Sequence, residues 1–170
     1  ERGYLNLKDD LIPPSVRSRV GRYTGFRGPN CFEAAVSFQD PSFSKSYLHN
    51  VKNEPHHHQL MINNDELYGL LQKHFIELDP VKTPLRFGDL IVFVDYGEAL
   101  TEEDFHYSWI KHASVFLLNE YTFSKGSKSA DSPYTIKTLD EEWVSWSRRY
   151  NFLKIKVFRK PVRQNSNFDN

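Results

Sequence analysis

Runs of apolar residues separated by polar breaks predict several β-strands in the second half of the chain. Leu90–Val94 is a continuous aliphatic and aromatic run of strand length, which is typical of a buried central strand. Asn119 and Glu120 separate two later apolar runs and predict a hairpin turn between them. The predicted strands are Leu90–Val94, His112–Leu118, Tyr121–Ser124, Pro133–Lys137 and Leu153–Phe158.

Two helices are predicted ahead of these strands. Asn30 is a favourable N-cap for a short helix over Cys31–Phe38. Asn63 or Asn64 is expected to cap a second helix. The apolar face of that helix carries Leu67, Leu71 and Phe75.

A third helix is predicted late in the chain, where Thr138 and Glu141 have the spacing of a capping box. The apolar residues that follow recur at helical spacing and are expected to pack on the sheet. They are Leu139, Trp143, Trp146 and Tyr150. Helices first, then an antiparallel sheet with one late helix, predict an α+β fold.

The length of 170 residues suits one domain with a continuous core. Residues 1–20 contain two adjacent prolines and mixed charges, and predict an extended N-terminal arm. Residues 21–163 form the expected folded domain. The polar residues 164–170 are expected to be a frayed tail.

The charge balance argues against a nucleic-acid partner, because 22 basic residues match 22 acidic ones. No apolar run approaches the roughly 18 residues that span a bilayer, so no membrane span is expected. The chain opens on Glu1 rather than Met, which favours an exported protein whose signal has been removed, in the periplasm or outside the cell. A cytoplasmic protein remains the alternative, and the sequence does not indicate the oligomeric state.

The one cysteine, Cys31, has no partner for an internal disulfide and is placed at the predicted start of a helix. A helix N-terminus favours a thiolate, which is the nucleophilic form of cysteine. His112 begins a predicted strand and is a candidate base for that thiol. The alternative is that both residues only pack in the core.

Three blocks of sequence resemble the NlpC-like cell-wall cysteine peptidases. They are Tyr23–Cys31, Phe87–Phe93 and His112–Leu117, within residues 20 to 126. The resemblance implies a minimal papain-like fold, with Cys31 as nucleophile and His112 as base. It also implies cleavage of peptide bonds in bacterial cell-wall stem peptides, with a peptide or peptidoglycan fragment as the partner.

The third catalytic position has several candidates. The resemblance implies Ser124, which a three-residue hairpin turn would place on the same face of the sheet as His112. A two-residue turn would instead place Ser127 opposite His112, with Lys125 diagonal to it. Asn119 and Glu120 have suitable side chains but are expected in the turn.

Two aromatic residues are candidate substrate contacts. Tyr23 could offer its phenol near the oxyanion, and Trp109 could line the cleft or shield His112. Packing in the core is the alternative for each. A metal at His56–His58 is disfavoured, because adjacent side chains on an extended chain diverge.

The sequence therefore predicts a thiol hydrolase of peptide or amide bonds that needs no cofactor and no metal. The alternative, from a different class of function, is a papain-like binding module for a peptide or cell-wall ligand that has no turnover.

Overall fold

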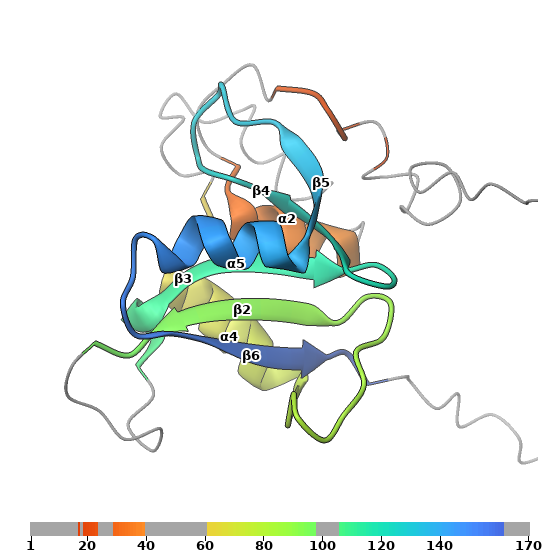
Figure 1. Cartoon of the computed structure of the whole chain (residues 1–170), viewed down its shortest axis with the longest axis vertical. Coiled ribbons are helices and arrows are strands. Elements are labelled where there is room, and N and C mark those ends of the chain that lie inside the picture. The colour runs from red at the N-terminus through yellow and green to blue at the C-terminus, as the bar shows by residue number, and fades with distance from the viewer. Residues whose placement is uncertain (1–16, 18, 24–28, 40–60, 98–105, 162–170) are drawn as a thin grey trace, which may run out of the picture.

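The computed structural model describes residues 17, 19–23, 29–39, 61–97 and 106–161. These residues form the predicted α+β arrangement, with one antiparallel sheet of six strands (Figure 1). The strands are β1 Ile76–Leu78, β2 Leu90–Asp95, β3 Ile110–Phe116, β4 Tyr121–Lys125, β5 Tyr134–Thr138 and β6 Leu153–Arg159. The helices are α2 Cys31–Gln39, α4 Asn64–His74, the short 3₁₀ helix η4 Tyr107–Trp109 and α5 Leu139–Ser147.

The sheet has the strand order β1-β6-β2-β3-β4-β5, so β2 is an inner strand. It pairs with β6 over its whole length and with β3 from Leu90 to Val94. All five of these residues are fully buried, as expected for a continuous apolar strand. The short edge strand β1 was not predicted from the sequence.

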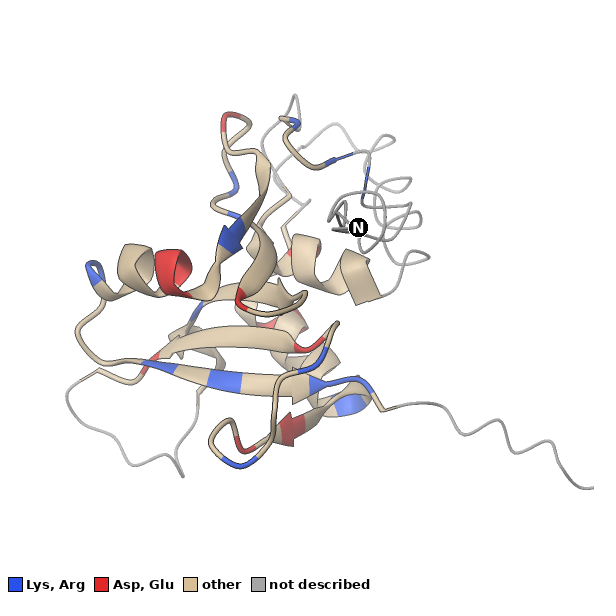
Figure 2. Ribbon diagram, turned by 45° about the vertical axis from the view of Figure 1, so that its right-hand side comes forward, with Lys and Arg blue, Asp and Glu red and all other residues tan. Residues whose placement is uncertain are grey.

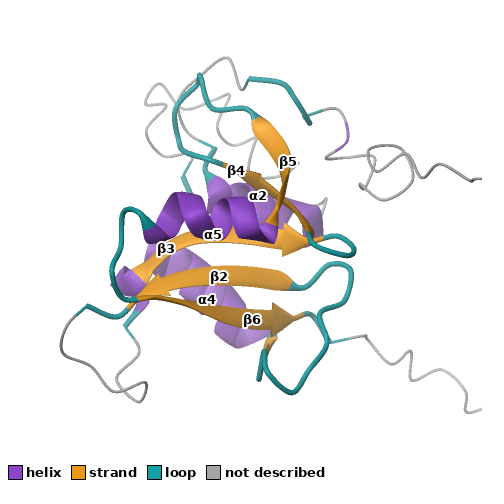
Figure 3. Ribbon diagram, viewed as in Figure 1, coloured by secondary structure: helices purple, strands orange, loops and turns teal. Residues whose placement is uncertain are grey.

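Helices cover both faces of the sheet, as Figure 3 shows with α5 in front and α2 and α4 behind. Side chains alternate along β3, so Ala113 and Val115 join the larger core with α2 and α4. On the other face, Phe116 joins a smaller core with Ile91 and Phe93, which α5 covers. His112 has the same alternation as Phe116 and lies on the α5 face, where its ring contacts Phe93.

The hairpin between β3 and β4 has a three-residue turn, Leu118–Glu120. Leu117 donates its N–H to the carbonyl of Tyr121, and Asn119 adopts φ 54°, in the left-handed region that Asn tolerates. Strand pairing then covers only Val115 with Phe123 and Phe116 with Thr122. Beyond these pairs β4 stays with β5 and turns away from β3 (Figure 1).

The start of α5 is confirmed, because Thr138 and Glu141 make both hydrogen bonds of a capping box. The predicted apolar face is wrong at one position. Leu139, Trp146 and Tyr150 pack against the smaller core, but Trp143 is 36% exposed. The buried residue of this helix is Glu142, because the sheet surface beneath it carries His112 and Ser124 as well as apolar side chains.

Basic and acidic positions are interspersed along the described part of the chain, as the coloured ribbon of Figure 2 shows. Among the described residues, no helix is long and apolar enough to cross a bilayer. Most of the predicted arm, the tail 164–170 and His56–His58 lie outside the described residues.

Asp89, at the entrance of β2, is 1% exposed and accepts hydrogen bonds from Arg159 Nε at 2.8 Å and Nη2 at 2.7 Å. It also accepts from the Arg86 N–H. We expect Asp89→Ala to lower the free energy of unfolding by about 1.5 to 3 kcal/mol, because hydrogen bonds to charged groups contribute that much. Urea unfolding measures this.

The control is Glu77→Ala. Glu77 also makes an ion pair, with Lys156 at 2.6 Å, but its side chain is 51% exposed. This variant should lose less than about 1 kcal/mol, because exposed pairs contribute little. An equal loss of unfolding free energy in the two variants would contradict the conclusion that the buried Asp89–Arg159 pair stabilises the fold more than an exposed pair does.

Candidate active site

Cys31 is the first residue of α2, at a helix end that is capped as predicted. The Asn30 side chain accepts from the Glu33 N–H at 3.0 Å and donates to the Ile62 carbonyl at 2.7 Å. Because Asn30 is itself buried, both bonds fix the start of the helix. Cys31 is a free thiol with 7% of its surface exposed.

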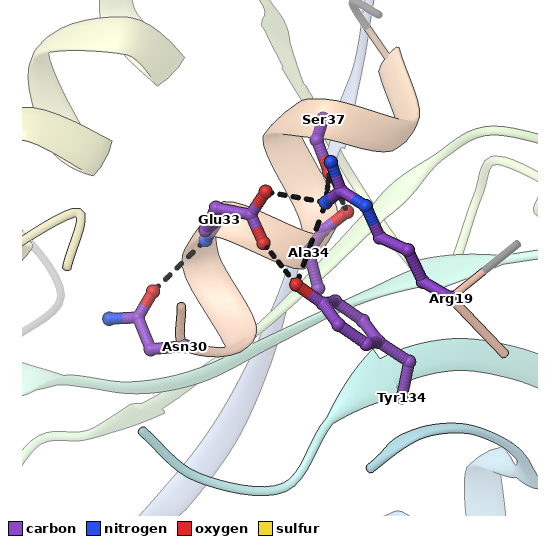
Figure 4. Close-up of polar contacts among 6 residues, drawn as sticks. All are labelled: Arg19, Asn30, Glu33, Ala34, Ser37 and Tyr134. Carbon is purple, nitrogen blue, oxygen red and sulfur yellow. Dashed lines mark hydrogen bonds and ion pairs between the residues drawn. The ribbon is translucent and has the colours of Figure 1, made fainter. Parts of the chain in front are cut away.

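A second buried group, the Glu33 carboxylate, holds α2 in place (Figure 4). One oxygen pairs with Arg19 at 2.7 Å, and the other accepts from the Tyr134 hydroxyl at 2.8 Å. Burial and the Glu33 charge raise the pKa of Tyr134, so the phenol stays protonated and donates. These contacts tie the cysteine helix to β5 and to Arg19, which lies ahead of it in the chain.

His112 projects from β3 at a place where the strand has one paired neighbour. Its ring is 1% exposed and lies 5.4 Å from the ring of Phe93, its partner residue in β2. The indole of Trp146 stacks on it, with ring centroids 4.6 Å apart and planes 21° apart. Aromatic rings therefore hold the orientation of the imidazole.

Glu142 of α5 supplies a carboxylate to this histidine. Its Oε1 lies 3.4 Å from His112 Nε2, and the same oxygen accepts a hydrogen bond from the Ser124 hydroxyl. Burial works to raise the pKa of the Glu142 carboxyl, but hydrogen bonding and charge from His112, aided by Ser124, hold it below its usual range. Glu142 is therefore the ionised partner of His112.

The other ring nitrogen, Nδ1, is buried and has no hydrogen-bond partner among the described residues. Burial of the ring lowers the pKa of His112. Interactions with Cys31 and, to a smaller extent, with Glu142 more than offset this effect and raise the pKa to about 9. Cys31 is therefore within electrostatic reach of the ring. A loose thiol–imidazole contact is common in structures without substrate.

A cysteine, a histidine and a carboxylate thus interact in series, with His112 as the member shared by the other two. The comparisons with known proteins return no match. No family model, curated protein or solved structure is significantly similar to this chain, so the site is described by its own geometry.

The residues predicted for the third catalytic position differ in their hydrogen-bond partners. The three-residue turn places Ser124 on the face of His112, but its hydroxyl bonds to Glu142 rather than to the imidazole. Lys125 is fully buried and donates to the carbonyls of Ser127 and Ser129. Neither Lys125 nor Ser127 has a hydrogen bond with His112 in the described structure. Asn119 and Glu120 lie in the turn, as expected.

The two candidate substrate contacts are not brought to this cluster. Tyr23 is 66% exposed and makes no hydrogen bond with another described residue. Trp109 lies in η4 and packs against Tyr96, with ring centroids 5.5 Å apart. The indole that covers His112 is Trp146, which the sequence analysis assigned to packing alone.

Glu142 is the residue that sequence reasoning missed, although a signal for it exists. Leu139, Glu142, Trp146 and Tyr150 also follow helical spacing, so the carboxylate lies on the apolar stripe. An acidic side chain in that position needs a buried partner.

As for metal ligands, no group of three His, Cys, Asp or Glu side chains that could hold an ion occurs among the described residues.

The ion pair predicts how His112 titrates. Replacing Glu142 by Gln removes the negative charge that favours the imidazolium, so the pKa of His112 should fall from about 9 toward the ordinary 6.5. Nuclear magnetic resonance of ¹³C-labelled histidine over a pH series measures this, and His112→Asn identifies the signal among the seven histidines.

The control is Glu141→Gln, which changes the adjacent, exposed carboxylate and keeps the spacing of the capping box. It should leave the His112 titration almost unchanged. A midpoint that moves equally in both variants would mean that Glu142 is not the specific partner.

Proposed function

We propose that this protein is a cysteine hydrolase of peptide or amide bonds that uses Cys31, His112 and Glu142. The observation that carries the proposal is the division of the His112 ring. Nε2 contacts a buried carboxylate, Nδ1 is left without a hydrogen-bond partner among the described residues, and Cys31 lies within electrostatic reach of the ring. A base needs this arrangement, because one nitrogen must be oriented while the other exchanges a proton with the nucleophile.

In the proposed reaction, His112 takes the proton of the Cys31 thiol, and the thiolate attacks the carbonyl carbon of the substrate. The first N–H groups of α2 face the developing oxyanion, since a helix leaves these donors without partners in its own backbone. His112 then gives its proton to the leaving amine, and the C–N bond breaks. Water, deprotonated by His112, hydrolyses the thioester and restores the thiol.

Three residues position the base in this mechanism. Glu142 holds Nε2–H and stabilises the imidazolium, while Ser124 fixes the carboxylate oxygen that makes this contact. Trp146 covers one face of the imidazole. Excluding water in this way strengthens the charge interactions within the cluster.

The substrate class rests on the sequence resemblance to NlpC-like peptidases. It implies a papain-like catalytic domain that acts on bacterial cell-wall stem peptides, and such an enzyme would work outside the cytoplasm. An antiparallel sheet with a capped cysteine helix on one face is compatible with that fold. Peptidoglycan fragments are therefore the first substrates to test.

Purified cell-wall fragments, with product masses read out, test the activity. Cys31→Ala should abolish product formation and keep the fold, because alanine suits a helix and only the nucleophile is lost. Glu142→Ala should lower kcat at least about tenfold, since an unoriented base loses part of its contribution. Ser124→Ala should lower kcat less, because it removes only the support of the carboxylate.

Glu141→Gln is the matched control and should retain wild-type turnover. Unchanged turnover in Cys31→Ala would exclude the thiol mechanism. Unchanged turnover in Glu142→Ala would reduce the catalytic set to Cys31 and His112.

A non-catalytic binding module is the second candidate, and the deep burial of Cys31 and His112 favours it. Iodoacetamide labelling at about pH 6 separates the two, because a thiolate reacts there and an ordinary buried thiol does not. A catalytic pair predicts rapid labelling that slows in His112→Ala. Slow labelling that is the same with and without His112 would favour the binding module.

A further inference from the structure

A polar cavity of about 290 Å³ lies beside the candidate site, lined by residues of β4, β5, the loop between them, α5 and the turn that follows α5. We call it the α5 cavity. Its inner wall contains His112, Glu142 and Trp146, and Cys31 is not part of its lining. The cavity therefore reaches the candidate base and its carboxylate partner without including the candidate nucleophile.

Two basic side chains line this cavity without a carboxylate partner. Lys137 comes from β5 and Arg149 from the turn after α5, and no ion pair joins either of them to an acidic residue within the described structure. The guanidinium of Arg149 lies 5.2 Å from the centre of the Trp146 ring, which restricts its position. The cavity therefore has two cations available for a ligand.

The rest of the lining consists largely of hydroxyl groups, from Ser127, Ser132 and Ser145 among others. The loop that carries the first two is tied down by Lys125, whose Nζ donates to the Ser127 and Ser129 carbonyls at 2.6 and 2.8 Å. The loop that forms this side of the cavity is therefore fixed by hydrogen bonds to the fully buried side chain of Lys125.

The one acidic residue in the lining, Glu142, does not cancel these cations. Its Oε1 is already in contact with His112 and Ser124, and its Oε2 is buried without a hydrogen-bond partner among the described residues. The imidazolium and this carboxylate neutralise each other as a pair, which leaves the charges of Lys137 and Arg149. A planar carboxylate suits such a site, because a guanidinium binds it through two parallel hydrogen bonds and hydroxyls donate to it as well.

We propose that the α5 cavity binds a carboxylate group carried by the leaving-group portion of the substrate, because His112, which protonates the leaving amine in the proposed reaction, lines this cavity. The identification of the ligand as part of a substrate rests on the proposed hydrolase function. The volume limits the ligand to about one side chain, since sites for larger ligands begin at roughly 300 Å³. An acidic side chain or a free peptide C-terminus satisfies this limit.

Binding is tested first without turnover, in Cys31→Ala protein, with glutarate and its uncharged analogue glutaramide as probes. Tryptophan fluorescence reports binding, because Trp146 lines the cavity. Glutarate should give a saturable change and glutaramide none. Lys137→Gln and Arg149→Gln should each weaken glutarate about tenfold, the change expected for one charge-assisted contact.

Arg148→Gln is the matched control, because Arg148 is an exposed neighbour on the chain that does not line the α5 cavity. It should bind glutarate as tightly as the parent protein. Equal responses to glutarate and glutaramide, no response to glutarate, or an equal loss in Arg148→Gln and Arg149→Gln would each overturn the carboxylate site.

A second arm identifies the source of the carboxylate. Wild-type protein is given two peptides that differ only in Glu or Gln on the leaving-group side, and kcat/KM should favour Glu by about tenfold, a preference that Arg149→Gln removes. Glutarate binding without this preference would overturn the substrate assignment and indicate a free anion as the ligand. If neither peptide is cleaved, the hydrolase proposal fails while the binding arm still decides the site.

Discussion

The contact between the Glu142 carboxylate and the His112 imidazole is the constraint on which this arrangement depends. It joins α5 to β3 across a layer that is otherwise apolar, with Trp146 stacked on the ring and Phe93 beside it. Removing two charges from water is costly, and only close contacts recover that cost. Ser124 provides one such contact by donating to the same carboxylate oxygen. The helix, the strand and the neighbouring hairpin are thereby fixed relative to one another.

This contact requires the sheet to open between β3 and β4. Strand pairing there covers only Val115 and Phe116 of β3, and β4 then continues with β5. If the two strands paired further, β4 would occupy the side of β3 where His112 has no paired neighbour. The three-residue turn at Asn119 and the divergence that follows therefore serve the site as well as the fold.

The sequence predicted the elements of this fold better than it predicted the site. Leu90–Val94 is apolar throughout and Asn30 is a strong cap, so local patterns were sufficient for β2 and for the start of α2. For α5, the same spacing fits both Trp143 and Glu142 as the buried residue. Hydrophobicity favours the tryptophan, and the opposite choice follows from polar residues on distant strands.

The side chain that partners His112 was hard to predict for a related reason. Family resemblance leads to Ser124, whereas hairpin register leads there only if the turn has three residues, as it does in the structure. They cannot identify a partner that lies 30 residues from His112 in the chain and comes from a helix. Ser124 instead supports that partner. Side-chain chemistry that depends on the packing of separate elements is not contained in any local pattern.

Further charges are buried around the start of α2, and positive and negative groups alternate among them. Arg19 pairs with Glu33, and Lys125 is within electrostatic reach of Glu33 and Cys31. Burial lowers the pKa of Lys125, while these two neighbours favour its charged form. Beyond Cys31 come the His112 imidazolium and the Glu142 carboxylate.

A thiolate at Cys31 completes this alternation, because it would lie between two positive groups, Lys125 and His112. The electrostatic environment of Cys31 therefore includes Lys125 of β4 as well as His112. Residues coupled in this way do not act independently, so the effects of changing Lys125 and His112 on the reactivity of Cys31 should not add. The reactivity of the thiol is then a property of the whole charged layer rather than of one histidine.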